Sequence, residues 1–111
     1  MVVMRTSNGR QEALRRVGQA LVDPTRCHIL LALLEGPAYP ARLATRLGLT
    51  RANVSNHLTC LRACGLVTAT PEGRQVRYEL ADERLRHALE DLADLILSIE
   101  PGHEPEARVR V

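Results

Sequence analysis

Apolar residues recur at helical spacing along the first part of the chain. In RQEALRRVGQALV, residues 10–22, they fall three or four positions apart and predict an amphipathic helix. A second helix is expected in DPTRCHILLALLEG, where Asp23 can cap the start and Pro24 suits the first helical position. Gly36 follows the last apolar residues and is expected to end this helix.

Two more helices are expected close together. The third runs from about Pro40 to Leu47 and ends at Gly48, and the fourth is capped by Thr50 and reaches Gly65. Only the sequence GLT lies between them. Such a short connection is typical of a helix-turn-helix.

The apolar period changes after Gly65. The segments LVTAT and QVRYEL are β-branched or alternating and flank PEGR, as in a β-hairpin. A long amphipathic helix then follows Asp82; its apolar positions are Leu85, Leu89, Leu92, Ile96 and Ile99. The pattern therefore predicts a mainly α fold with a β-hairpin wing, a winged helix-turn-helix that dimerises through its N- and C-terminal helices.

The length of 111 residues suits one domain. We place it at 10–99, between a flexible N-terminus, 1–9, and a mobile tail, 100–111, whose prolines and polar residues leave little to bury. No apolar run approaches the roughly 20 residues that span a bilayer, and MVVMRTSNGR lacks the apolar stretch of a signal peptide. We therefore expect a cytoplasmic protein without a membrane partner, whose three cysteines stay reduced.

Charge is unevenly distributed, although the net charge is only +2. Residues 41–78 hold six arginines and one glutamate, whereas residues 79–106 hold nine carboxylates and two arginines. The middle of the chain therefore favours a polyanion and the C-terminal part repels one. The absence of Phe and Trp argues against base stacking on aromatic side chains.

The fourth helix has a polar face suited to double-stranded DNA. At about 100° per residue, Val54, Leu58 and Leu61 cluster toward the core. Short hydrogen-bonding side chains on the other side suit base edges in a major groove, and arginine suits phosphate or guanine. The residues predicted to bind DNA are Arg51, Asn53, Ser55, Asn56 and Thr59 from this helix, and Arg74 and Arg77 from the hairpin.

The same helix carries a strip of candidate metal ligands at the edge of the core. Asn53, His57, Cys60 and Cys64 follow one another at three- or four-residue spacing. Residues four apart have Cβ atoms about 5–6 Å apart, so two thiolates can hold one ion. Thiolates favour soft ions, with Cd²⁺, Pb²⁺ and Zn²⁺ first and arsenite as a further candidate. The alternative is that these cysteines are small buried apolar residues, as we expect for Cys27.

These segments together resemble the ArsR/SmtB family of metal-responsive bacterial repressors. DPTRCHILLALLEG, LATRLGLTRANVSNHLTCLRACGLV and EGRQVRYEL match its pattern from about residue 13 to 99, and the paired cysteines resemble its cadmium- and lead-sensing CmtR branch. The resemblance implies a homodimeric repressor that binds its operator without metal and dissociates when metal binds. It also implies a third thiolate from the other subunit's tail.

This tail has no cysteine, so we expect His103 of the other subunit to be the third ligand, with His57 or water as alternatives. Two further metal sites of the family are expected to be missing. The third-helix site lacks its ligands because GPAYPARLA has no thiol. The terminal-helix site lacks them because its expected ligand positions are near Arg84, Leu95 and Ser98, which are neither histidines nor carboxylates.

Two other functions remain to be weighed. An ArsR-type regulator that responds to thiol oxidation, arsenite or a non-metal effector is the main alternative. A cysteine enzyme using His57 and Cys60 is disfavoured, because no third orienting group and no Gly-rich phosphate loop occur. We therefore predict a DNA-binding repressor with Cd²⁺ or Pb²⁺ as effector, no organic cofactor and no enzymatic activity.

Overall fold

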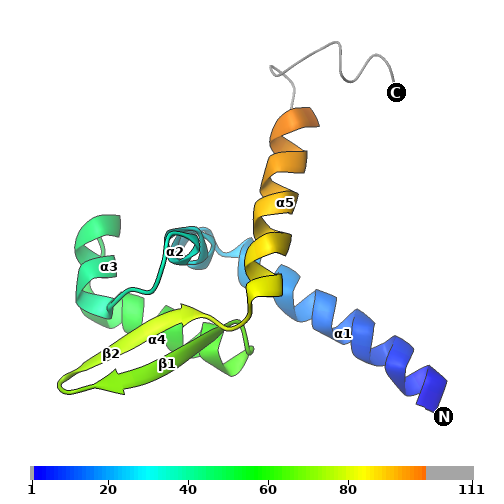
Figure 1. Cartoon of the computed structure of the whole chain (residues 1–111), viewed down its shortest axis with the longest axis horizontal. Coiled ribbons are helices and arrows are strands. Elements are labelled where there is room, and N and C mark those ends of the chain that lie inside the picture. Colours follow the sequence, from blue (N-terminus) through cyan, green and yellow to red (C-terminus); the bar gives the residue numbers. More distant parts are fainter. Residues whose placement is uncertain (1, 100–111) are drawn as a thin grey trace. The chain divides into compact units, whose positions relative to one another are not determined.

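A computed structural model describes residues 2–99, with side chains from Gly9 onward. The elements are α1 (Val2–Val22), α2 (Pro24–Leu34), α3 (Pro40–Leu47), α4 (Arg51–Ala63), β1 (Val67–Glu72), β2 (Gln75–Leu80) and α5 (Glu83–Ile99), as labelled in Figure 1. The chain forms two compact units, divided between Ala81 and Asp82. The predicted mainly α chain with one hairpin is confirmed. No helix among residues 2–99 is long and apolar enough to cross a bilayer.

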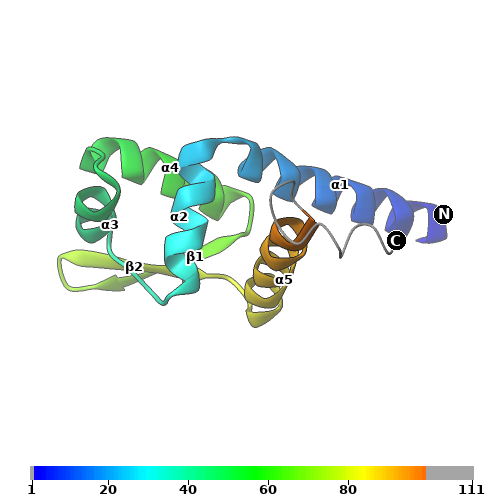
Figure 2. The same ribbon diagram turned by 90° about the horizontal axis from the view of Figure 1, so that it is seen from above.

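The core of the first unit is aliphatic and lies between its helices and the hairpin. Seven of its side chains are almost completely buried: Ile29, Leu30, Leu33, Leu43, Val54, Leu58 and Leu61. Leu66, Val67 and Leu80 close it from the hairpin side. Figure 2 shows α2, α3 and α4 grouped with the hairpin at one end of this unit. The helix-turn-helix therefore has a core of its own.

Side chains and glycines define the helix ends, largely as the sequence predicts. The Asp23 carboxylate accepts a 2.9 Å hydrogen bond from the Arg26 N–H, and Thr50 Oγ1 accepts one of 3.0 Å from the Asn53 N–H. Gly48 closes α3 with a left-handed φ of 69° that glycine adopts without strain. The predicted bounds of α3 are confirmed, and α4 ends at Ala63, close to the predicted Gly65.

The hairpin is tighter than the sequence indicated. Its register runs from Val67 opposite Leu80 to Glu72 opposite Gln75, so only Gly73 and Arg74 form the turn. Gly73 has a φ of 62°, which suits the first position of a two-residue loop. The prediction that PEGR forms the turn is therefore wrong for its first two residues, because cross-strand pairing continues through them.

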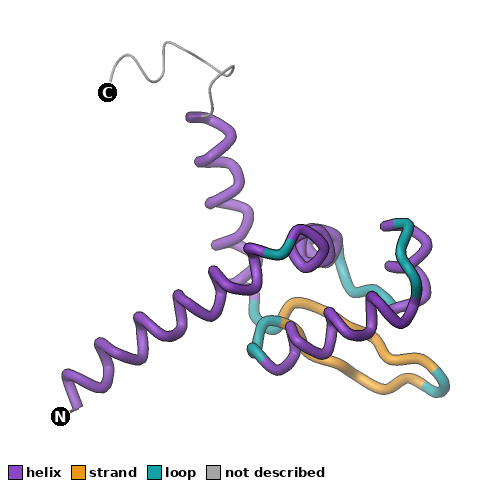
Figure 3. Tube along the Cα trace, turned by 180° about the vertical axis from the view of Figure 1, so that it is seen from behind, coloured by secondary structure: helices purple, strands orange, loops and turns teal. Residues whose placement is uncertain are grey.

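The hairpin is also joined to the segment before α3. Ala38 and Tyr78 exchange two backbone hydrogen bonds, of 2.9 and 2.8 Å. Strand β2 therefore has neighbours on both sides, and β1 is the outer strand. Figure 3 shows the two strands running side by side. Pro71 lies in β1, where the missing N–H of proline is tolerated.

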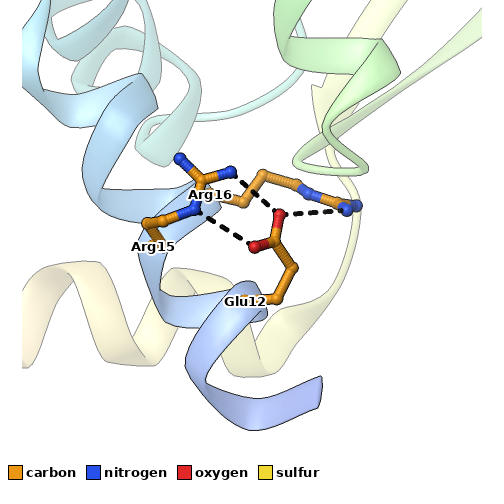
Figure 4. Close-up of polar contacts among 3 residues, drawn as sticks. All are labelled: Glu12, Arg15 and Arg16. Atoms are coloured by element: carbon orange, nitrogen blue, oxygen red, sulfur yellow. Dashed lines mark hydrogen bonds and ion pairs between the residues drawn. The ribbon is translucent and has the colours of Figure 1, made fainter. Parts of the chain in front are cut away.

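Helix α1 begins at Val2, eight residues before the predicted start near residue 10. The prediction relied on apolar spacing, which begins only at Ala13, whereas a helix extends at little cost once it has formed. Its exposed surface carries local ion pairs: Glu12 lies 3.0 Å from Arg15 and 3.7 Å from Arg16 (Figure 4). The hydrogen bond from Arg15 lowers the pKa of Glu12.

The second unit contains α5. Asp82 Oδ1 accepts a 2.7 Å hydrogen bond from the Arg84 N–H, and the same two side chains form a 3.0 Å ion pair. Hydrogen bonds from Arg84 lower the pKa of Asp82 to about 2. None of the residues of α5 is buried, and its exposed apolar side chains are Leu92, Leu95, Ile96, Leu97 and Ile99. The predicted tail, with His103, lies outside the described residues.

Candidate functional site

Helix α4 has one face in the core and one face in solvent. Val54, Leu58 and Leu61 are completely buried, which confirms the predicted inner face. The five residues predicted to bind DNA from this helix, Arg51, Asn53, Ser55, Asn56 and Thr59, are all exposed. The helix therefore presents a continuous polar surface while its apolar face holds it against the first unit.

The polar groups of this surface are not equally available. Thr59 Oγ1 donates a 2.9 Å hydrogen bond to the Ser55 carbonyl oxygen, so its hydroxyl hydrogen is already engaged. Within the described part of the chain, the side chains of Ser55 and Asn56 have no hydrogen-bond partner. They can donate to and accept from base edges without breaking an existing contact.

The two wing arginines have different surroundings. Arg74 is exposed in the hairpin turn and has no ion-pair partner among residues 9–99. Arg77 is 35% exposed, with Nε 3.2 Å from Glu72 Oε2 and Nη2 3.9 Å from Glu79 Oε2. The sequence assigned the same role to both arginines, but only Arg74 has an uncompensated charge.

Two cysteines lie at the C-terminal end of α4, Cys60 in its last turn and Cys64 at its C-cap. Cys60 is exposed, and Cys64 is half-buried at the C-cap, where its N–H donates a 3.0 Å hydrogen bond to the Cys60 carbonyl oxygen. Two accessible thiols one turn apart suit a soft metal ion. Within the described residues of one chain, no three His, Cys, Asp or Glu side chains gather as a metal site. One chain therefore supplies a pair of thiols that needs further ligands.

His57 contacts another part of the helix-turn-helix. Its Nδ1 lies 3.9 Å from Asp23 Oδ2, at the carboxylate that caps α2, and its side chain is 22% exposed. The backbone hydrogen bond from Arg26, with a smaller contribution from His57, lowers the pKa of Asp23. This position favours a packing role for His57. Cys27 is half-buried, so it lies at the edge of the core rather than inside it as predicted.

Sequence analysis missed Tyr39 and Glu72. The Tyr39 hydroxyl donates a 2.7 Å hydrogen bond to Glu72 Oε1, across 33 positions of sequence. That bond is the main reason why the pKa of Tyr39 is raised. Neither residue belongs to a motif, and no local pattern brings the two together.

A cleft of about 230 Å³ lies between the start of α3, the first turns of α4 and the hairpin. Arg51, Ser55 and Arg74 contribute to its lining, together with Tyr39 and Tyr78. Three residues that were predicted separately as DNA contacts are therefore brought to one place. A larger hollow beside α3 contains none of the predicted site residues.

Comparisons with known proteins agree with this architecture. Residues 23–69 match the family described as bacterial regulatory protein, arsR family. The HTH-type transcriptional regulator CmtR of Mycobacterium tuberculosis is 61% identical over 97 residues, which cover 87% of this chain and 82% of that protein. A probable mercury resistance operon repressor of Streptomyces lividans is 37% identical over 82 residues, covering 74% and 60%.

Solved structures give the same result. The NMR structure of the cadmium metal-sensor CmtR from M. tuberculosis has a TM-score of 0.64 and 60% identity, over 81% of this chain and 94% of that one. A homodimeric winged helix-turn-helix DNA-binding domain from Mycobacterium bovis has a TM-score of 0.80 and 27% identity, over 87% and 90%. The relatives are transcriptional regulators rather than enzymes, as predicted. The chain therefore belongs to the ArsR family of bacterial regulatory proteins.

Proposed function

We propose that this transcriptional regulator is a metal-responsive repressor. It binds operator DNA in the cytoplasm as a homodimer and leaves it when Cd²⁺ or Pb²⁺ binds Cys60 and Cys64, with Zn²⁺ as a third candidate. One observation carries the proposal: the two thiols lie at the C-terminal end of the helix whose exposed face bears the polar residues suited to bases. A ligand at these thiols acts directly on the recognition helix.

The DNA contacts follow from the exposed face of α4. Ser55 and Asn56 are placed to recognise bases, with Asn53 and Thr59 beside them, and Arg51 faces the backbone or a guanine. Arg74 adds a charge from the hairpin turn. Phosphate contacts of this kind make binding strongly dependent on salt.

Exposed apolar residues on the terminal helices support a homodimer. Ile96 is 53% exposed and Leu92 51%, and on α1 Leu14 is 74% exposed. Apolar side chains at helical spacing that find no burial within the chain favour a second copy. The M. bovis structural relative is described as homodimeric.

The donor set fits a soft ion but is incomplete in one chain. Cys60 and Cys64 would hold the ion, which would supply a bond between the end of α4 and whatever completes the site. His103 of the other subunit is our candidate for the next ligand, and His57 is the intrachain alternative. A related structure is described as a cadmium metal-sensor.

The same thiols also support a second candidate function. Cys60 is exposed and lies one helical turn from Cys64, so the two thiols can be oxidised or can bind arsenite. A regulator of this kind releases DNA after treatment with an oxidant or arsenite, without a divalent metal. Metal-induced release under reducing conditions separates the two functions.

Anisotropy of labelled DNA from upstream of the gene tests the proposal. Wild-type protein should bind as a dimer and lose about 5–150-fold in affinity with Cd²⁺ or Pb²⁺, the usual range for coupled sites. Cys60→Ser and Cys64→Ser should bind DNA without metal nearly as well as wild type but ignore the metal. Cys27→Ser is the matched control and should respond normally. An unchanged metal response in Cys64→Ser would overturn the proposed site.

A titration with Cd²⁺ tests the ligands themselves. Near-ultraviolet thiolate absorbance should correspond to about two sulfurs per ion and disappear in either serine variant. His103→Ala should weaken Cd²⁺ binding by about 10–100-fold if the other subunit's tail completes the site. No change would exclude His103 and leave His57 or water.

A further inference from the structure

The hairpin carries two arginines in opposite electrostatic settings. Arg77 lies between two carboxylates, Glu72 and Glu79, so the three side chains together carry a net charge of −1. Arg74 lies exposed in the turn and forms no ion pair with any described residue. A phosphate is therefore repelled by the first group and attracted by the second.

Glu72 also connects the hairpin to the start of α3. Its carboxylate accepts the 2.7 Å hydrogen bond from Tyr39, the residue directly before Pro40. The backbone hydrogen bonds between Ala38 and Tyr78 lie in the same region. Arg77 Nε forms an ion pair, at 3.2 Å, with the other oxygen of Glu72 and so completes a link from the middle of β2 to the N-terminus of α3.

Tyr39, at one end of this link, also lines the cleft between α4 and the hairpin turn. The cleft of about 230 Å³ has Arg51 and Ser55 from α4 on one side and Arg74 and Gln75 from the turn on another. Arg51 and Arg74 are both exposed, and neither has an ion-pair partner in the described part of the chain. Two arginines without an ion-pair partner, more than twenty positions apart in the sequence, therefore line the same cleft.

We propose that Arg51 and Arg74 clamp a single DNA backbone phosphate over this cleft, and that Arg77 does not touch DNA but positions the hairpin through Glu72 and Tyr39. The proposal rests on the DNA binding proposed above and names the nucleic-acid group that the cleft takes. It also gives Arg77 a different role from the one that its sequence position suggested.

The ligand chemistry follows from the cleft. Guanidinium groups form paired hydrogen bonds with phosphate oxygens, and the Ser55 hydroxyl can donate a further one. A base edge would not need two cations. Conversely, if Arg77 turned toward a phosphate, it would leave Glu72 and Glu79 uncompensated beside the DNA, which is electrostatically unfavourable.

The salt dependence of DNA binding by the full-length dimer measures how many DNA phosphates the protein neutralises. Each neutralised phosphate contributes about 0.9 to the slope of log affinity against log salt. Because a dimer holds two clamps, Arg51→Gln/Arg74→Gln should lower the slope by about 1.8, whereas separate phosphates for the two arginines would lower it by about 3.6. Arg10→Gln, which removes an exposed arginine outside the cleft, is the matched control and should leave the slope unchanged.

Arg77→Gln should behave differently. Affinity should fall by about fivefold or more, the lower end of typical coupling between sites, while the salt slope stays at its wild-type value. Glu72→Ala should also weaken binding, although it removes a negative charge from the DNA-facing unit. Glu35→Ala, which breaks the exposed Glu35–Arg46 ion pair, is the control for loss of a carboxylate.

Each outcome decides whether Arg77 positions the hairpin and whether Arg51 and Arg74 clamp a phosphate. A reduced slope in Arg77→Gln, or tighter binding with a steeper slope in Glu72→Ala, would make Arg77 a phosphate contact and overturn the positioning role. An unchanged slope in Arg51→Gln/Arg74→Gln would overturn the clamp. In both cases wild-type DNA binding would persist, whereas a wild-type protein that binds no duplex DNA would refute the proposed function itself.

Discussion

Helices α4 and α5 are both amphipathic, but they bury their apolar faces in different ways. In α4, Val54, Leu58 and Leu61 have no exposed surface, because α2, α3 and the hairpin cover them within the same chain. In α5 no residue is buried, and Ile96 and Leu92 remain about half exposed. Helix α4 is therefore held by its own unit, whereas α5 has an apolar face without a complete cover.

This difference separates two kinds of stability. The core around α4 should respond to mutation in the same way at any protein concentration. The apolar face of α5 should matter only where a second surface covers it, so its mutations should depend on concentration. Two changes test this division, and two more compare the starts of α4 and α5.

The largest effect is expected in the core. Leu58→Ala removes a completely buried side chain and should lower the free energy of unfolding by about 2–5 kcal/mol. Chemical denaturation measures this loss, which should not vary with protein concentration. Asn56→Ala, on the exposed face of the same helix, is the control and should change stability by less than about 0.5 kcal/mol.

A smaller effect is expected on the apolar face of α5. Covering the exposed half of Ile96 contributes about 1 kcal/mol per subunit, so Ile96→Ala should weaken the dimer by about 2 kcal/mol, roughly thirtyfold in Kd. Sedimentation equilibrium measures the change. If dimerisation is unaffected and the monomer is destabilised instead, α5 is covered within its own chain and the comparison fails.

The start of α4 provides a third test. Thr50→Ala removes the hydroxyl that accepts the Asn53 N–H and should cost about 1 kcal/mol of stability. Thr50→Ser, which keeps the hydroxyl, should restore most of it. Thermal unfolding of the two variants side by side shows whether the cap or the methyl group is responsible.

The smallest effect concerns the start of α5, which, unlike that of α4, is capped by a titrating group. The folded pKa of Asp82 is about 2, below its ordinary value of 3.8, because Arg84 hydrogen-bonds to its carboxylate. Its contribution is therefore present above pH 3.8 and is lost as the pH falls through about 2. An NMR titration should give this pKa, and Arg84→Ala should return it toward 3.8.

Local patterns explain why much of this structure was predictable. The caps Asp23 and Thr50 and the bounds Pro40–Leu47 follow from short-range rules, and the buried face of α4 follows from helical periodicity. The hairpin register was harder to predict, because the tight turn depends on pairing across the strands rather than on the sequence PEGR alone.

The roles within the candidate site were harder to predict than its members. Arg74 and Arg77 are equivalent by charge and position, and only the fold places Glu72 beside one of them. The Tyr39–Glu72 hydrogen bond spans 33 residues, so no local pattern indicates it. The pair Cys60 and Cys64, by contrast, follows directly from helical spacing.

The position of Pro71 affects how readily separate molecules aggregate. Strand β1 is the outer strand of a hairpin, and such an edge offers free backbone groups to any other extended chain. Proline has no N–H to offer at that edge, and the neighbouring Glu72 adds a charge. These two residues oppose edge-to-edge pairing of wings from different molecules, so a projecting hairpin need not become a seed for aggregation.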